Sequence, residues 1–339
     1  MKLLVRATNW VGDAIMALPA LRAVRSHCAD GYITILARPY VAAISKNQHV
    51  CDDMILVDDK ADMDNELRAR KFDAAVLLQN AFQAAWFAWR AGIPERIGYA
   101  RDGRSFLLTK AVPVPRAGEI PAHEQFYYLE LLRRAGWLSD LPKEEFIKLN
   151  VLEEDRRHAS EFLVSAGANQ NSLRIAIGAG ASYGSAKCWP PDRFAELANR
   201  LQAQTHAEVI LFGTASEAAV SSAISAGMRR PPIDLTGKTS IADLPALLSQ
   251  CHLFIGNDSG AMHVAAAVGL PVVAIFGPTD PFGTSPVTQR CSIVQEKSYC
   301  SPCFLRRCPT DHRCMTRVTP DAVESAARQW IPLTEVSPA

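Results

Sequence analysis

The sequence predicts an α/β protein of two Rossmann-like domains with a cleft between them, each domain a mostly parallel sheet covered by helices on both faces. Short apolar runs of strand length alternate with helical patterns along nearly the whole chain. This rhythm is interrupted between residues 141 and 155, where a proline and a charged run separate two halves. A chain of 339 residues, of which 48% are hydrophobic, is long enough for two cores. We therefore predict a first domain at 1–152, a second at 153–318, and a C-terminal helix and tail at 319–339.

The first half begins with an apolar strand that ends at a polar turn. The strand KLLVRA (2–7) is followed by the turn TNWVGD (8–13) and by a helical pattern over 14–26, in which Pro19 is expected to introduce a kink. Asp13 therefore lies at the carboxyl end of a strand, where open α/β sheets bind ligands. From the spacing alone, Asp13 is either a general base or a helix N-cap. The same alternation predicts strands at 32–37, 54–57, 72–78 and 96–99, and helices at 39–45, 60–70, 81–91 and 123–137.

The second half repeats the alternation after a helix at 154–167. Its first strand leads into a loop of small residues, 178–190, in which backbone amides and Lys187 suit a phosphate. The loop lacks the third glycine of a GxGxxG motif, so it is a weak signal by itself. Glu217 opens a later helix and is either a ribose ligand or a carboxylate that stabilises the helix N-terminus. Strands are predicted at 173–177, 208–212, 233–235, 252–256 and 272–276, and helices at 192–204, 240–249, 261–268 and 320–330.

Residues 251–286 carry the clearest chemical signal. The turn formed by Asn257, Asp258, Ser259 and Gly260 joins a buried strand to a helix of small apolar residues. The start of that helix directs free N–H groups and a partial positive charge at the space above the sheet, as anion binding requires. His263 follows Ser259 by one helical turn, so both side chains can face one ligand. The alternative interpretation is that Asp258 or Ser259 only caps a core helix and that His263 is an ordinary surface histidine.

Composition argues against several functional classes. Lys plus Arg (36) nearly balances Asp plus Glu (35), which gives no support for nucleic-acid binding. Polar residues interrupt the early apolar run, and no run of 18 apolar residues exists, so neither a signal peptide nor a membrane span is predicted. We expect a cytoplasmic protein with reduced thiols. One local exception is a cluster of arginines that is either an ordinary solvated surface or a basic patch for an anionic acceptor, namely Arg90, Arg96, Arg101 and Arg104.

Five segments, in order along nearly the full chain, carry a family resemblance. They are RATNWVGDAIMALPALRAVR (6–25), GASYGSAKCWP (180–190), LTGKTSIADLPALL (235–248), NDSGAMHVAAAVGLPVVAIFGPTDP (257–281) and CSPCFLRRCPTDHRCM (300–315). With these segments the chain resembles the ADP-heptose:lipopolysaccharide heptosyltransferases, inverting enzymes of glycosyltransferase family 9 with the GT-B fold. The NWVGD form at residues 9–13 is similar to heptosyltransferase II, which adds the second heptose of the inner core. Cys188 departs from the family pattern, in which a basic residue is common at this place.

The resemblance implies a role for each matching residue. Asp13 corresponds to the general base, and Lys187 and the turn at Asp258 stabilise the departing diphosphate, with Asp258 holding a heptose hydroxyl or orienting Lys187. Glu217 is expected at the ribose, and residues 236–238 near the adenine. The full set of expected donor-binding residues is Ser182, Glu217, Thr236, Gly237, Lys238, Asp258, Ser259, Gly260 and His263. The expected acceptor-binding residues are Arg6, Asn9, Trp10, Arg101 and Arg104.

The implied partners are ADP-heptose, the lipid A–Kdo–heptose core acceptor and, peripherally, the cytoplasmic face of the inner membrane. No essential cofactor is implied, and stimulation by Mg²⁺ is left open. The C-terminal helix is expected to pack back on the first domain, as in other GT-B enzymes. The alternative functions are heptosyltransferase I, another family 9 transferase, a nucleotide-sugar epimerase, or a nucleotide-sugar binder without catalysis. A carboxylate at Asp13 favours the enzymes over the binder, which needs no base.

The last of the five segments contains four cysteines within 15 residues. The spacing C-x2-C-x4-C-x5-C can ligate a structural zinc ion, although it differs from the common paired-knuckle forms. Free thiols or a labile disulfide are the alternatives. The four residues are Cys300, Cys303, Cys308 and Cys314.

Overall fold

The computed structural model describes residues 1–57, 63–142 and 146–331 of the chain. It divides into two compact units, Met1–Ile147 and Lys148–Ala339. The predicted boundary, between residues 152 and 153, falls slightly later along the chain. The reason for the earlier boundary is local: the amide of Leu149 donates to the carbonyl of Ala267, 2.8 Å away, so the chain already belongs to the second unit there.

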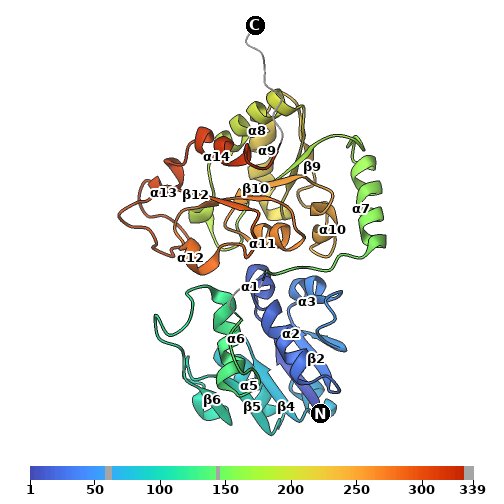
Figure 1. Cartoon of the computed structure of the whole chain (residues 1–339), viewed down its shortest axis with the longest axis vertical. Helices are drawn as coiled ribbons and strands as arrows, with labels where there is room; N and C mark the ends of the chain where they lie inside the picture. The colour runs from blue at the N-terminus through green and yellow to red at the C-terminus, as the bar shows by residue number, and fades with distance from the viewer. Residues whose placement is uncertain (58–62, 143–145, 332–339) are drawn as a thin grey trace. The chain divides into compact units, whose positions relative to one another are not determined.

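The first unit contains a six-stranded sheet in the order β3-β2-β1-β4-β5-β6, and every strand pair is parallel. Figure 1 shows helices around this sheet. The central strands are buried on both faces because their residues are almost all apolar. The strands are β1 (Lys2–Arg6), β2 (Tyr32–Ala37), β3 (Asp53–Leu56), β4 (Ala74–Leu77), β5 (Glu95–Tyr99) and β6 (Lys110–Val112).

The helix predicted at 14–26 is two helices in the structure. α1 (Val11–Met16) and α2 (Leu18–His27) meet at Ala17, and Pro19 stands in the first turn of α2, where its missing N–H costs no hydrogen bond. The predicted kink is therefore confirmed as a break just before the proline. The other helices of this unit are α3 (Pro39–Ser45), α4 (Met63–Arg70), α5 (Phe82–Arg90), η1 (Ser105–Leu107, a 3₁₀ turn) and α6 (Glu124–Arg134). Residues 60–62 of the helix predicted at 60–70 lie outside the described residues.

The second unit repeats the topology of the first. Its parallel sheet has the order β12-β11-β10-β7-β8-β9, so that β7, β8 and β9 correspond to β1, β2 and β3, and β10, β11 and β12 to β4, β5 and β6. Both sheets thus have the strand order of a Rossmann fold. The strands are β7 (Arg174–Gly178), β8 (Glu208–Phe212), β9 (Ile233–Asp234), β10 (Leu253–Asn257), β11 (Val272–Phe276) and β12 (Cys291–Gln295).

The helices of the second unit pack on a core formed by these strands. The C-terminal helix α14 (Pro320–Ala327) contacts α8, β11 and β12 and contributes Val323 and Ala327 to this core. Its apolar face is therefore used within the second unit, and the prediction that this helix packs back on the first domain stays a prediction. The tail at 332–339 lies outside the described residues. The remaining helices are α7 (Glu153–Ser165), η2 (Ser185–Lys187), α8 (Pro191–Thr205), η3 (Ala215–Glu217), α9 (Ala218–Gly227), α10 (Leu244–Leu248), α11 (Gly260–Ala267), α12 (Pro281–Thr284) and α13 (Arg313–Thr316).

Candidate active site

Each sheet has one point where the chain order of its strands reverses. In the first unit this point lies between β1 and β4, and in the second between β7 and β10. Ligands of open α/β sheets bind beyond the carboxyl ends of the strands at such points. The segments that leave these ends are the turn before α1, the loop at 179–190, and the turn at 257–260. These are the segments on which the sequence placed its candidate residues.

Hydrogen bonds from Arg6 hold the turn after β1 in place. Arg6 is buried, and its guanidinium donates to the carbonyls of Ala7 and Leu36 and to Asn9 Oδ1, the last at 2.8 Å. Tyr40 donates its hydroxyl to the carbonyl of Asn9 at 2.7 Å. Burial lowers the pKa of Arg6 to about 10. The prediction that Arg6 binds the acceptor is therefore corrected: its donors are directed to the protein, and it shapes the turn that carries Asn9 and Asp13.

Asp13 lies in the first turn of α1, whose N-cap is Trp10, so the helix begins earlier than predicted and Asp13 is not its N-cap. Glu124 at the start of α6 is the electrostatic neighbour of Asp13. Burial and, to a smaller extent, the charge of Asp13 raise the pKa of Glu124 to about 7, although Arg101 and a hydrogen bond with Tyr128 act in the opposite direction. Two carboxyl groups thus share one region of the first unit, and at neutral pH one of them is close to half protonated. Glu124 was not predicted, because a glutamate in a first helical turn ordinarily serves only the helix dipole.

The arginines predicted to bind the acceptor have different surroundings. Arg104 is completely buried and donates to the carbonyls of Tyr99 and Gln79 and to Asn80, which ties the loops after β4 and β5 together. Its predicted contact with an acceptor is therefore wrong. Arg101 is partly exposed and donates to the hydroxyl of Tyr127 at 3.2 Å, and Trp10 is exposed at the turn before α1. Arg101, Trp10 and Asn9 remain candidates.

Arg90 and Arg96 also have structural partners. Arg90 forms an ion pair with Asp64 at 2.9 Å, and Arg96 Nε donates to the carbonyl of Leu107 at 2.6 Å. The arginine cluster seen in the sequence is thus a set of separate contacts rather than one basic patch.

In the second unit, Lys187 and Asp258 form the centre of the candidate site. Lys187 Nζ lies 2.5 Å from Asp258 Oδ2, and the two side chains are 13% and 5% exposed. Thr279, in the loop after β11, donates its hydroxyl to the same carboxylate oxygen at 2.6 Å. The ring of Tyr183 lies 4.8 Å from Lys187 Nζ. Three segments that are distant in the sequence therefore meet at one carboxylate oxygen of Asp258, an arrangement in which Asp258 can orient Lys187.

Asn257 fixes the loop that carries Lys187, a role that sequence reasoning missed. This side chain is completely buried at the end of β10. Its Nδ2 donates to the carbonyl of Ala179 at 2.6 Å, and its Oδ1 accepts from the amide of Trp189 at 3.0 Å. Both ends of the loop are thus held by one amide group. The indole of Trp189 is buried and donates to the carbonyl of Val318, which anchors the loop in the core.

The segment with the four cysteines, residues 300–315, also forms hydrogen bonds with the loop at 179–190. The amide of Ala186 donates to the carbonyl of Arg306 at 3.1 Å, and the hydroxyl of Tyr183 donates to the carbonyl of Phe304 at 2.6 Å. At Gly184 a Cβ would lie 2.2 Å from the carbonyl oxygen of Arg306, so only glycine permits this approach.

The four thiols of this segment form no disulfide with one another, and a zinc ion bound by them stays a prediction. Cys300, Cys303, Cys308 and Cys314 are free thiols, and within residues 1–57, 63–142 and 146–331 no group of three or more His, Cys, Asp or Glu side chains is arranged to hold a metal ion. Hydrogen bonds to Thr310 lower the pKa of Cys308, whereas burial raises that of Cys314.

The turn after β10 has the predicted form. Ser259 is the N-cap of α11 and accepts a hydrogen bond from the amide of Met262, so the capping role is present. His263 is buried one turn later, which contradicts the alternative of an ordinary surface histidine. Gly260 opens the helix, and Ser182 is exposed on the loop after β7. Whether these residues contact a donor stays a prediction.

Glu217 lies directly over the loop after β7. A Cβ at Gly180 would lie 1.8 Å from Glu217 Oε1, so Gly180 is what allows the carboxylate to approach. Glu217 Oε2 also accepts from the amide of Thr214 at 2.7 Å, which completes a capping box. Thr236 lines the same small recess, and the backbone of Gly237 has the positive φ of 71° that glycine adopts readily. The structural role of Glu217 is therefore established, and its ribose role stays a prediction.

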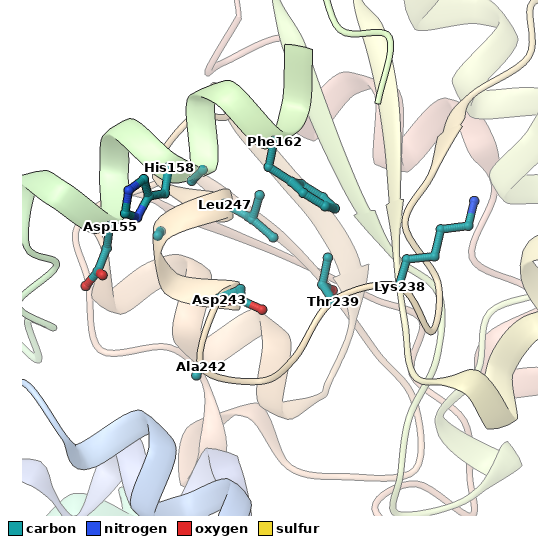
Figure 2. Close-up of a pocket in the computed structure, with 10 residues that line it drawn as sticks. Asp155, His158, Phe162, Lys238, Thr239, Ala242, Asp243 and Leu247 are labelled. Atoms are coloured by element: carbon teal, nitrogen blue, oxygen red, sulfur yellow. The ribbon is translucent and has the colours of Figure 1, made fainter. Parts of the chain in front are cut away.

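A pocket of about 290 Å³ opens beside this region (Figure 2). Phe162 and His158 of α7 form one wall, and Lys238, Thr239 and Leu247 form another. Of the predicted donor-binding residues, Lys238 is the one that lines this pocket.

Solved structures of known proteins share this fold. The structure of E. coli ADP-heptose lipopolysaccharide heptosyltransferase II is similar with a TM-score of 0.83 and 26% identity, covering 97% of this chain and 98% of that one. E. coli heptosyltransferase WaaC with ADP has the same fold, with a TM-score of 0.71 and 18% identity over 98% of this chain and 100% of that one. The fold is thus that of a GT-B glycosyltransferase.

The sequence comparisons give the family. Residues 61–313 match the profile of glycosyltransferase family 9 (heptosyltransferase), and the chain belongs to this family of glycosyltransferases. Lipopolysaccharide heptosyltransferase 2 of E. coli K12 is 28% identical over 316 residues, covering 87% of this chain and 88% of that protein. Lipooligosaccharide heptosyltransferase 2 of Campylobacter jejuni is 27% identical over 337 residues, covering 98% of each.

Proposed function

We propose that this protein transfers a heptose from ADP-L-glycero-D-manno-heptose to the heptose already present on the lipopolysaccharide inner core, which is the heptosyltransferase II reaction. The observation that carries the proposal is the Lys187–Asp258 pair at the second switch point, in a family 9 chain with a carboxylate, Asp13, at the first. The relatives named heptosyltransferase 2, which match over most of this chain, support the choice of acceptor.

The donor half of the proposal follows from the second unit. An ADP leaving group carries negative charge on its diphosphate, and charge builds up there as the bond to the sugar breaks. Lys187 has three N–H donors, so it can keep its contact with Asp258 and still donate to a phosphate oxygen. The amides at the start of α11, with Ser259 and His263 on that helix, would add donors to the diphosphate. Glu217 would accept the ribose hydroxyls, with the adenine towards Thr236, Gly237 and Lys238.

The acceptor half follows from the first unit. Asp13 would accept the proton of the acceptor hydroxyl while that oxygen forms its bond to the anomeric carbon. The bond from that carbon to ADP breaks on the opposite face, so the configuration inverts through a transition state with oxocarbenium character. Asn9 and Trp10 on the same turn, and Arg101 on the loop after β5, would contact the phosphorylated sugar. No essential cofactor enters this scheme.

The natural acceptor is anchored in lipid, so the protein would work at the cytoplasmic face of the inner membrane. Within the described part of the chain, no helix is both long enough and apolar enough to cross a membrane. A peripheral contact with the lipid surface is therefore what the proposal requires.

The test is donor-dependent turnover. The purified chain is incubated with an inner-core acceptor that carries one heptose and with ADP-heptose, UDP-glucose or GDP-mannose, and release of the nucleotide is measured with and without EDTA. The proposal expects release of ADP that requires both substrates and continues in EDTA. Faster release of UDP or GDP would contradict the donor, and release of ADP without acceptor would point to a hydrolase instead.

A further inference from the structure

Helix α5 in the first unit has its large and small side chains in an unusual distribution. Ala84, Ala85 and Ala88 are its buried residues, whereas the exposed surface carries Phe82 and Trp89. Helices of globular proteins normally bury their large apolar residues and expose polar ones. Alanines on the inner side let α5 lie close to the sheet, while Phe82 and Trp89 are left at the surface. Exposed aromatic rings on the outer side of such a helix are a candidate binding surface.

The exposed rings of Phe82, Trp89 and Phe106 form one continuous row with Trp86, which is partly buried against the core. The ring centroid of Phe106, in η1, lies 6.2 Å from that of Phe82, which lies 6.1 Å from Trp86, which in turn lies 5.2 Å from Trp89. Phe106 is 75% exposed, Trp89 47% and Phe82 41%. We call Phe82, Trp86, Trp89 and Phe106 the aromatic row. Its rings come from two elements, α5 and η1, so the row is a feature of the fold and not of one helix alone.

A cation lies against the aromatic row. The guanidinium of Arg90 lies 5.9 Å from the ring centroid of Trp86, and its side chain is partly exposed. Tryptophan and phenylalanine flanked by arginine are the side chains that settle at the boundary between acyl chains and headgroups.

The aromatic row begins at the edge of the sheet that carries the candidate base. Phe82 follows β4 and Phe106 follows β5, while Asp13 follows β1, and these strands are parallel neighbours in the order β1-β4-β5. Their carboxyl ends therefore lie along one edge. The aromatic row and the turn that carries Asp13 can therefore face the same membrane at the same time.

A second copy of the chain is a poorer occupant than a bilayer. The exposed parts of Phe82, Trp89 and Phe106 together offer on the order of 300 Å² of aromatic surface, because a whole aromatic side chain buries about 150–250 Å². A standard protein interface needs about 800 Å² from each partner. A few aromatic anchors with flanking cations are, in contrast, sufficient for reversible binding to anionic lipid.

We propose that the aromatic row is the surface by which this protein binds an anionic lipid bilayer. This proposal rests on the proposed function for its biological meaning, since a lipid-anchored acceptor requires such contact. The apolar rings enter the headgroup boundary, and Arg90 meets anionic headgroups. The binding is a property of the protein and the lipid alone, and it requires neither donor nor acceptor.

The test uses vesicles of phosphatidylethanolamine and phosphatidylglycerol without lipopolysaccharide. The full-length protein is compared with the double variant Trp89→Gln, Phe106→Ser by co-sedimentation. The partition coefficient is expected to fall at least about tenfold in the variant. A matched control, Phe282→Ser with Tyr299→Ser, removes two rings that are at least as exposed but lie in the second unit, and it should partition like the wild type. Thermal unfolding confirms that each variant is folded.

Two results would overturn the proposal. One is equal partitioning of the wild type and the double variant, including the absence of binding in both. The other is a concentration-dependent dimer of the wild type that the variant lacks in analytical ultracentrifugation, which would assign the row to a second copy.

Kinetics separate this proposal from the proposed function. With acceptor embedded in vesicles, the double variant should show a higher acceptor KM, and with a delipidated core oligosaccharide its kinetics should match the wild type. A higher KM with both acceptors would instead place the row in the sugar site and contradict the proposal. If vesicle binding falls in the double variant but the wild type transfers no heptose, the proposed function would be contradicted and the lipid surface would still be supported.

Discussion

Lys187 and Asp258 form an ion pair between the loop after β7 and the turn after β10, with 2.5 Å between Nζ and Oδ2. Both side chains are largely withdrawn from water, so each charge depends on the other. Thr279 and Tyr183 complete the surroundings of the pair. The pair therefore positions a cation at the switch point before any ligand arrives, and this is the pre-organisation that stabilisation of a leaving group requires.

The first prediction concerns the Lys187 side chain. Lys187→Met should abolish most of the thermal protection that ADP gives, because the variant loses the ammonium group that would face the diphosphate. It should also lower the stability of the free protein by about 3 kcal/mol, because Asp258 is left as a buried and unpaired carboxylate. Thermal unfolding with and without ADP measures both effects. Lys297→Met, which changes an exposed lysine of the same unit, is the control. Unchanged protection by ADP in Lys187→Met would remove Lys187 from the donor site.

The second prediction concerns Asp13. Asp13→Asn should retain protection by ADP and lose at least about a hundredfold in kcat, since the amide has nearly the shape of the carboxylate but cannot accept the proton. Asp30→Asn, an exposed carboxylate in the same unit, should keep wild-type turnover. Initial rates under saturating substrates measure the effect. Turnover within about tenfold of the wild type in a folded Asp13→Asn protein would exclude Asp13 as the base.

The third prediction separates two neighbouring arginines. Arg104→Ala should destabilise the protein by several kcal/mol, because it leaves the carbonyls of Tyr99 and Gln79 without their buried donor. Arg101→Ala should fold normally, raise the KM for the anionic acceptor and flatten its dependence on salt, while the KM for ADP-heptose stays the same. Urea unfolding and steady-state kinetics at two salt concentrations measure these effects. Equal stability of the two variants would contradict the structural role of Arg104.

The fourth prediction concerns pH. The pKa of Glu124 is raised to about 7 in the folded protein, so the native state keeps a proton that the unfolded state loses. The contribution of this group to stability should therefore be constant below about pH 4, fall as pH rises towards 7, and level off above that. Glu124→Gln cannot titrate and should lack this fall, which amounts to about 1–3 kcal/mol. Urea unfolding of both proteins at pH 5 and pH 8 measures the difference, and equal pH slopes would contradict the assignment.

The fold was predictable because buried parallel strands and amphipathic helices have distinct local patterns. The missed strands, β6 and β12, are the last strands of their sheets and lack a buried apolar run: Lys110 and Ala111 are exposed in β6, and Ile293 is exposed in β12. An edge strand forms through backbone hydrogen bonds to its neighbouring strand, and the local sequence does not show which strand that is. The contacts of α14 with α8, β11 and β12 were not predictable for a similar reason, because an apolar helix face does not specify which core it joins.

The candidate site was partly predictable because parallel strands bring their carboxyl ends to one edge. The strand-to-helix junctions singled out Asp13, Lys187 and Asp258 as candidates, and the family resemblance supplied their expected roles. Asn257 acts through contacts with residues up to 78 positions away, and no local pattern reveals them. The opposite error occurred for Arg104, since a run of arginines resembles a charged surface whereas its guanidinium is in fact enclosed by carbonyls. Burial of a charge is a property of the tertiary structure.

The most direct test of the central claim is mass spectrometry of the acceptor after incubation with ADP-heptose. The purified protein is given inner-core acceptors that carry zero, one or two heptoses, alongside the Asp13→Asn variant. The account predicts the gain of a single heptose by the acceptor that carries one, and no gain in the variant. The gain of a heptose by the acceptor that carries none or two, or by no acceptor at all, would contradict it.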